Sequence, residues 1–149
     1  MKFGIHAGLW MARWTDEITP ILKTVADLGF DGVEVSLLGM SDEKADALGK
    51  AVKEYGLEVT CSDGLAPDKD ITSADPLVRQ AGIEYLRWAI ETTARIGSRG
   101  LAGVVYAPWG MYDPANKVQR AARSSEAFAA IDDHLAKHDV TLGLSLIHI

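Results

Sequence analysis

The chain has 149 residues, enough for about one domain with a buried hydrophobic core. Hydrophobic residues make up 48% of it and charged residues 24%, which excludes a disordered chain. The formal net charge of −6 disfavours nucleic acid as a partner, because a phosphate backbone would be repelled. Cys61 has no second cysteine to pair with, and no apolar run approaches the ~18 residues of a membrane span. We therefore expect a cytoplasmic protein without a membrane partner.

A repeated pattern runs along the chain: an amphipathic helix ends at a turn, and a short apolar run follows. The expected strands are 2–9, 31–37, 57–61, 100–106 and a fifth from 140 onward. The expected helices begin at Thr15-Asp16, Ser41, Asp75-Pro76 and about Val118, and they end near Leu28, Tyr55, Arg95 and Lys137. Gly29, Gly56 and Gly97 follow the first three helices, where glycine supplies a left-handed cap. Helices that alternate with buried strands predict a parallel α/β fold.

Two architectures fit this order of elements. A closed (β/α)8 barrel needs roughly 250 residues, whereas this chain provides four βα units and a fifth strand. The chain is therefore either the first half of a (β/α)8 TIM barrel or a complete, five-stranded, doubly wound domain. In both architectures ligands bind at the carboxyl ends of the strands, where the loops leave the scaffold.

Aromatic, hydroxyl and carboxylate side chains converge at those expected strand ends, a combination that suits a small polyol. They are His6, Trp10, Trp14, Glu34, Ser36, Cys61, Ser62, Asp63, Tyr106 and Trp109. Glu34 favours a functional role, since a carboxylate that ends an apolar strand is costly without a partner or ligand. Trp14 and Trp109 fit packing as well as a pocket wall, and His6 fits a hydrogen-bonded strand histidine as well as a ligand contact. Cys61 is expected to be a small, inert core residue.

Two further clusters have a plain interpretation. His134 and His138 lie four residues apart on one expected helix and could share a metal. They lie in its last turn, where cationic side chains suit the helix dipole, and no third ligand is evident, so we interpret them as structural. Residues 68–70, Asp-Lys-Asp, are interpreted as a solvated face.

A glycine-rich phosphate loop and a Cys-x-x-Cys pair are both missing from the sequence, which disfavours nucleotide binding and a zinc ribbon.

Four segments resemble the ketose 3-epimerases, the D-tagatose and D-psicose 3-epimerases of the sugar phosphate isomerase/epimerase group of xylose isomerase-like barrels. These segments are 1–6 followed by Trp10 and Trp14, Leu28-Gly29-Phe30-Asp31-Gly32-Val33-Glu34-Val35, 56–61 followed by Gly64-Leu65, and Gly103-Val104 followed by Trp109. The resemblance spans residues 1–143 in order. It implies half of a TIM barrel whose full-length form binds a small-molecule sugar and a divalent metal, usually Mn²⁺. We also expect that full-length form to be a homo-oligomer.

In that family a metal-bound glutamate removes the C3 proton next to the ketose carbonyl and gives an enediolate, and a second glutamate returns a proton from the opposite face. The resemblance also implies substrate-binding positions. His6 falls where the family often has an aromatic residue near the sugar, and Trp14 matches a pocket tryptophan. Ser62 falls where some members have a substrate-contacting cysteine. Trp109 matches a tryptophan after the fourth strand, and Glu34 matches a glutamate that supports the pocket.

The chain departs from the family pattern at its fifth strand. Ser145 occupies the position of the first metal-ligand glutamate, which is also a catalytic group, so we expect no catalytic residue, no metal ligand and no bound metal in this fragment. Residues 144–149 read Leu-Ser-Leu-Ile-His-Ile, which is also the translation of a transposon-end adapter used in sequencing libraries. We therefore expect 1–143 to be the N-terminal half of the barrel and 144–149 to be a non-native tail.

The expected function is that of a sugar epimerase or isomerase, inactive as this 149-residue chain. Two alternatives remain open. The first keeps the fold and changes the chemistry, to a hydroxypyruvate isomerase or an inosose dehydratase. The second is a non-enzymatic, doubly wound α/β binding module. Helices on one side of a curved sheet would favour the barrel, whereas helices on both faces of an open sheet would favour the module.

Overall fold

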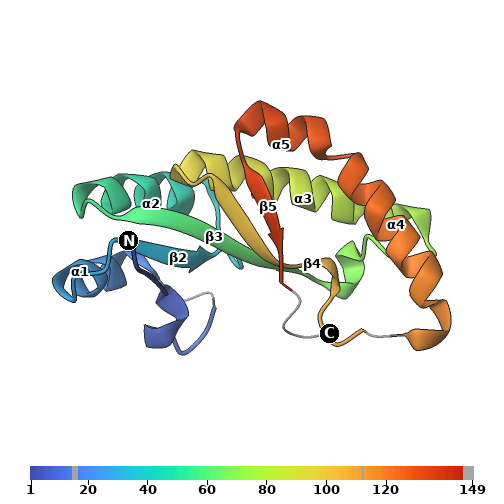
Figure 1. Cartoon of the computed structure of the whole chain (residues 1–149), viewed down its shortest axis with the longest axis horizontal. Helices are drawn as coiled ribbons and strands as arrows, with labels where there is room; N and C mark the ends of the chain where they lie inside the picture. The colour runs from blue at the N-terminus through green and yellow to red at the C-terminus, as the bar shows by residue number, and fades with distance from the viewer. Residues whose placement is uncertain (15–16, 112, 146–149) are drawn as a thin grey trace.

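The computed structural model describes residues 1–14, 17–111 and 113–145, which form one parallel sheet covered by helices (Figure 1). The strands are β1 (Gly4–His6), β2 (Gly32–Ser36), β3 (Glu58–Leu65), β4 (Gly100–Pro108) and β5 (Thr141–Leu144). The α-helices are α1 (Thr19–Asp27), α2 (Asp42–Glu54), α3 (Pro76–Ile96), α4 (Lys117–Ala129) and α5 (Asp132–His138). Three short 3-10 helices, η1 (Ala7–Trp10), η2 (Pro67–Lys69) and η3 (Pro114–Asn116), follow the carboxyl ends of β1, β3 and β4. No helix of the described ranges is long and apolar enough to cross a membrane.

The strand order distinguishes the two expected architectures. Neighbours in the sheet are consecutive in the chain, in the order β1-β2-β3-β4-β5, and every pair is parallel. A doubly wound sheet reverses its order at a switch point, and none is found in this sheet. Right-handed crossovers in one direction place successive helices on the same side, and α1 contacts α2, α2 contacts α3, and α3 contacts α5. The predicted first half of a TIM barrel is confirmed, and the doubly wound arrangement is not found.

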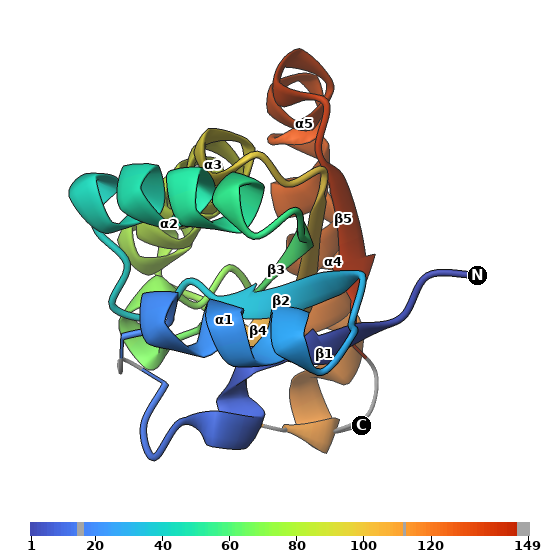
Figure 2. The same cartoon turned by 90° about the vertical axis from the view of Figure 1, so that its left-hand side faces the viewer.

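The sheet is strongly curved, so one of its faces is concave and the other carries the helices. In Figure 2, β2 runs across the view and β5 runs down it, with α2 and α3 together on one side of the sheet. Buried side chains of the strands, among them Val33, Val35 and Leu101, join those of the helices in one core. The edge where β1 to β4 end at His6, Ser36, Leu65 and Pro108 is called the carboxyl edge below, and the opposite edge is called the amino edge.

Local sequence signals explain where several elements begin and end. Asp75 caps α3, because its carboxylate accepts a hydrogen bond from Leu77 N at 2.9 Å, and Pro76 occupies the first helical position. Gly97 ends that helix with a left-handed φ of 95°. Asp139 takes the same role after α5, with a φ of 53°. Aspartate tolerates this conformation better than most residues, which explains why the last unit needs no glycine there.

Several expected boundaries were wrong. β1 ends at His6 and the chain continues as η1, so the first strand is shorter than expected. β3 runs on to Leu65, well past the expected end at Cys61. α1 begins at Thr19, with Pro20 in its first turn, whereas its expected start at 15–16 lies outside the described residues. The single helix expected from 118 to 137 is two helices, α4 and α5.

Gly103 permits the close pairing of β3 and β4. Its φ is 140°, and a Cβ built on it would lie 1.9 Å from the carbonyl oxygen of Asp63, far inside van der Waals contact. Gly100, on the same strand, would place a Cβ at an ordinary 3.5 Å from Thr60 Cγ2. The two glycines therefore form a matched pair for testing this contact.

We expect Gly103→Ala to lower the free energy of unfolding by more than about 2 kcal/mol, because the methyl group must push the two strands apart. Gly100→Ala should change it by less than about 1 kcal/mol. Urea unfolding followed by circular dichroism measures both values. Equal effects of the two substitutions would contradict the close approach at Gly103.

Candidate functional site

Three polar side chains from three neighbouring strands meet at the carboxyl edge on the concave face. The register places His6 beside Glu34 and Ser36 beside Ser62. His6 Nε2 lies 3.1 Å from Ser62 Oγ and 3.5 Å from Glu34 Oε1. All three are partly exposed, so they remain open to a ligand from the concave side.

The backbone of η1 determines how His6 presents its ring. Gly8 N donates a hydrogen bond of 2.9 Å to His6 Nδ1. In the neutral imidazole the proton therefore lies on Nε2, which faces the oxygens of Ser62 and Glu34. Trp14 packs edge-on against the same ring, with the centroids 5.3 Å apart. Four of the five predicted substrate-binding residues are thus in one place.

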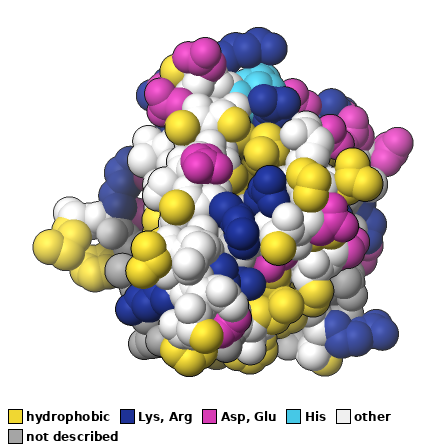
Figure 3. Space-filling view, turned by 90° about the vertical axis from the view of Figure 1, so that its right-hand side faces the viewer, with side chains coloured by type: hydrophobic (Ala, Val, Ile, Leu, Met, Phe, Trp, Pro, Cys, Tyr) yellow, Lys and Arg dark blue, Asp and Glu magenta, His cyan; other side chains and the backbone are white. Residues whose placement is uncertain are grey.

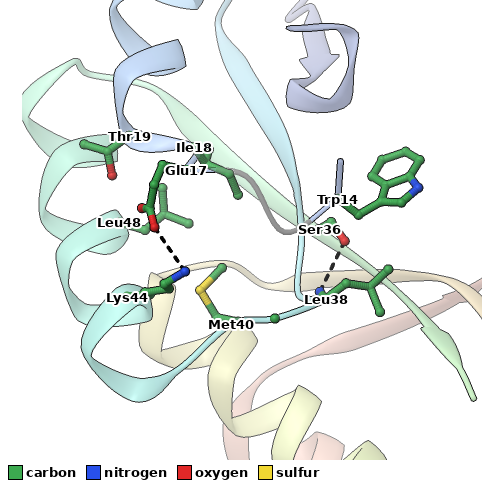
Figure 4. Close-up of a pocket in the computed structure, with 10 residues that line it drawn as sticks. Trp14, Glu17, Ile18, Thr19, Ser36, Leu38, Met40, Lys44 and Leu48 are labelled. Carbon is green, nitrogen blue, oxygen red and sulfur yellow. Dashed lines mark hydrogen bonds and ion pairs between the residues drawn. The ribbon is translucent and has the colours of Figure 1, made fainter. Parts of the chain in front are cut away.

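A shallow hollow lies beside Trp14, between the end of β2 and the segment before α1 (Figure 4). Ser36 closes the turn at its base, because its Oγ accepts a hydrogen bond from Leu38 N at 3.2 Å. At its side, Lys44 of α2 forms an ion pair of 3.0 Å with Glu17. This pair ties α2 to the residues that directly precede α1.

Trp109, the fifth predicted residue, lines a different hollow beyond the end of β4. This cavity of about 760 Å³ lies between the end of β4, α4 and Leu144, a size within the range of small-molecule sites. Tyr106, Met111 and Phe128 contribute to its mostly apolar wall. The indole of Trp109 is 70% exposed. The described residues therefore place Trp109 at the same edge as the other four without bringing it into their cluster.

The loop beneath this second hollow is anchored by a buried ion pair that the sequence did not reveal. Residues 68–70 were expected to be solvated, yet Asp70 is 3% exposed and lies 3.3 Å from the Arg120 guanidinium of α4. Thr72 donates to the same carboxylate through both its N–H and its hydroxyl. Arg123 donates to the Thr72 carbonyl at 3.1 Å. Burial of Asp70 corrects the earlier interpretation and fixes the loop after β3 to α4.

Cys61 and Asp63 lie within β3 and point away from the concave face. Successive residues of a strand point to opposite sides, so Ser62 faces His6 while its two neighbours face the helices. Burial raises the pKa of the Cys61 thiol to about 11, so it stays protonated at neutral pH, as an inert core residue does. Asp63 Oδ1 accepts hydrogen bonds from Gly64 N and from the Tyr85 hydroxyl of α3, whereas Oδ2 is buried and has no hydrogen-bond partner among the described residues.

The described residues at the carboxyl edge do not assemble a site for a catalytic metal. Ser145 stands where the resemblance places a glutamate, and its backbone N–H donates to Gly103 O at 2.9 Å. A serine hydroxyl supplies no carboxylate charge for a hard divalent cation. Within residues 1–14, 17–111 and 113–145, the one group of three side chains suited to a metal lies elsewhere, at Glu91, His134 and His138. The Mn²⁺ implied by the resemblance therefore does not fit the residues present at this edge.

Comparison with known proteins agrees with the strand order. Residues 22–148 match the family described as "Xylose isomerase-like TIM barrel". The chain belongs to this family. An L-ribulose 3-epimerase of Mesorhizobium japonicum is 32% identical over 148 residues, which cover 99% of this chain and 50% of that protein.

Solved structures give the same result. A D-psicose 3-epimerase determined in the presence of D-fructose superposes with a TM-score of 0.88 at 27% identity, over 95% of this chain and 51% of that one. An L-ribulose 3-epimerase superposes with a TM-score of 0.86 at 34% identity, over 97% and 49%. The chain thus spans about half the length of the relatives it matches. The predicted resemblance to the ketose 3-epimerases is confirmed.

Asp63 gives the fold a pH dependence whose sign follows from its surroundings. Burial raises its pKa from 3.8 to about 6, so the folded state holds the proton more tightly than the unfolded chain does. The stability contributed by protonated Asp63 is therefore present below pH 4 and is lost as the pH rises through about 6. We expect the free energy of unfolding of the wild type, relative to Asp63→Asn, to fall by about 1–3 kcal/mol between pH 4 and pH 7. Urea titrations across this range measure it, and a difference that does not change with pH would contradict the assignment.

Proposed function

We propose that this chain supplies the sugar-binding half of a ketose epimerase. The observation that carries the proposal is the joining of His6, Glu34 and Ser62 at the carboxyl edge, beside Trp14, in a chain similar to ketose 3-epimerases along almost its whole length. In a TIM barrel this edge is where substrates bind.

The chemistry of these side chains suits a small sugar. An indole covers the apolar C–H face of a polyol, while imidazole, carboxylate and hydroxyl groups exchange hydrogen bonds with its hydroxyls. Because Gly8 occupies Nδ1, His6 presents an N–H donor toward the concave side, between two acceptors. Trp109 would then close the sugar from the side of β4, opposite Trp14.

Epimerisation next to a ketose carbonyl needs a base on one face of the carbon, an acid on the other, and stabilisation of the charge that develops on oxygen. At the concave carboxyl edge the described residues offer Glu34, which is already engaged with His6. We therefore assign binding and orientation of the sugar to this chain. The proton-transferring groups, the divalent metal and the oligomer are proposed for the remainder of the full-length barrel, since the relatives are about twice as long.

The proposal predicts opposite results for the chain alone and for a completed barrel. With Mn²⁺ present, the 149-residue chain should not exchange the C3 proton of L-ribulose or D-psicose with solvent deuterium. Residues 1–143 fused to the Mesorhizobium L-ribulose 3-epimerase from the position that aligns with Leu144 onward should do so, because the joined chain then has that protein's own fifth strand. NMR of the sugar in D₂O measures the exchange. Exchange by the chain alone would refute the assignment of binding to this chain and of proton transfer to the rest of the barrel. A folded, metal-loaded fusion that exchanges the C3 proton of neither sugar would refute the proposed epimerase activity.

The two tryptophans provide a separate test of the binding role. In the fusion, Trp14→Ala and Trp109→Ala should each lower kcat/KM by about tenfold or more, since each loses an aromatic contact to the sugar worth about 1.5 kcal/mol. Tyr55→Ala is the matched control, because Tyr55 is an exposed aromatic residue at the end of α2, near the amino edge. Equal losses in all three variants would show that the tryptophans act through stability and not through the sugar.

A further inference from the structure

A cluster of three metal-ligating side chains lies at the amino edge, away from the concave carboxyl edge. Glu91 lies in the C-terminal part of α3, and His134 and His138 lie on α5, the helix that leads directly into β5. Helices of this fold run antiparallel to their strands, so both segments lie near the starts of the strands. The sequence had suggested the histidine pair without a third ligand, and the packing of α3 against α5 brings Glu91 to it.

The distances within the cluster are close to those of a coordination sphere. His134 Nε2 lies 3.1 Å from Glu91 Oε1, and the two imidazole rings have centroids 4.7 Å apart. One ligand atom from each of the three residues lies within 4.8 Å of the other two. Ligand atoms around one tetrahedral Zn²⁺ are about 3.3 Å apart. The first contact already has this spacing, and a small rotation of the exposed Glu91 side chain or of the His138 ring would bring in the third atom.

The ring nitrogens themselves indicate a missing partner. Nε2 of His134 and Nε2 of His138 are both buried from solvent, and neither makes a hydrogen bond within the described residues. The contact of His134 with Glu91 has the distance of an ion pair without the geometry of a hydrogen bond. Buried polar atoms without partners are costly and rare in folded proteins, so two of them side by side call for a ligand. A metal ion would take up the lone pairs of both rings and the charge of the carboxylate at once.

We propose that Glu91, His134 and His138 form a zinc site that joins α3 to α5. Two imidazoles and one carboxylate are a ligand set typical of Zn²⁺, with a water molecule in the fourth position. Imidazole nitrogen suits zinc better than it suits Mg²⁺ or Ca²⁺, which prefer oxygen ligands. Histidine surface is visible at the top of the face in Figure 3, where Figure 1 places α5.

This site would act on the fold and not on the sugar. α5 is seven residues long and has no fully buried residue of its own; of its apolar side chains, Leu135 packs against the core while Ala136 is exposed. A metal that binds the folded chain and not the unfolded one raises stability in proportion to its occupancy. Zinc would thereby hold the end of the fourth βα unit against α3 and fix the start of β5.

The test is a zinc titration of the 149-residue chain against a chromophoric chelator, with Co²⁺ as a spectroscopic probe. We expect one Zn²⁺ per chain, an intense visible Co²⁺ band of tetrahedral coordination, and a melting temperature that rises with zinc. His134→Ala, His138→Ala and Glu91→Gln should each weaken zinc binding at least tenfold and reduce the Co²⁺ band. Far-UV circular dichroism of the metal-free variants shows whether they are folded.

Three control variants separate this site from other zinc contacts. Glu84→Gln changes the glutamate of α3 that pairs with Gln80, and His6→Asn and His148→Asn remove the chain's other two histidines. All three should bind zinc as the wild type does. Absence of stoichiometric binding, a loss that is equal in the controls, or retention of tight binding in Glu91→Gln and His138→Ala would each overturn the proposal. The last result would support the structural interpretation, in which the two histidines only interact with the dipole at the C-terminal end of α5.

Discussion

The pairing of β2, β3 and β4 in one parallel register determines what each face of the sheet can do. Because side chains alternate along a strand, Ser62 reaches the concave face, where His6 contacts it, while Cys61 and Asp63 enter the layer of helices. A shift of one residue would exchange these roles and place the thiol of Cys61 and the carboxyl group of Asp63 on the concave face. Gly103 preserves the register, since no other residue permits its backbone so close to Asp63.

The two edges of the sheet carry different groups of polar side chains. At the carboxyl edge, short 3-10 helices and loops present aromatic and polar side chains that are open to a ligand. At the amino edge, helices end against strand starts, and ligand atoms of Glu91, His134 and His138 lie within 4.8 Å of one another there. The loop after β3 is fixed to α4 by the buried ion pair of Asp70 and Arg120. Removing either partner alone would be costly, because it would leave the other charge buried and unpaired.

Much of the fold could be predicted because its signals are local. Asp75-Pro76 and Gly97 mark the two ends of α3 without reference to any other part of the chain. The misjudged features depend on distant partners. Residues 62–64, Ser-Asp-Gly, have the composition of a turn, yet they continue β3 because β4 pairs with them. No glycine or proline marks the break between α4 and α5, and nothing near His134 in the sequence indicates that α3 will bring Glu91 to it. Of the site, the meeting of His6 with Glu34 and Ser62 could be predicted because parallel strands end at one edge.

Two carboxylates on neighbouring strands show why a raised pKa does not by itself identify a catalytic acid. Perturbed pKa values are frequent at active sites, and Asp63, at about 6, would be the obvious candidate on that ground. Its cause is burial, however, and both of its oxygens lie on the helix side, one bonded to Gly64 and Tyr85 and the other enclosed. A ligand on the concave face cannot reach either oxygen without crossing the sheet. Glu34 lies on the correct face, but His6 already contacts it. Position relative to the sheet, and not acidity, therefore decides which carboxylate can meet a ligand on the concave face, and this supports the proposal that this half of the barrel has a binding role and not a proton-transferring one.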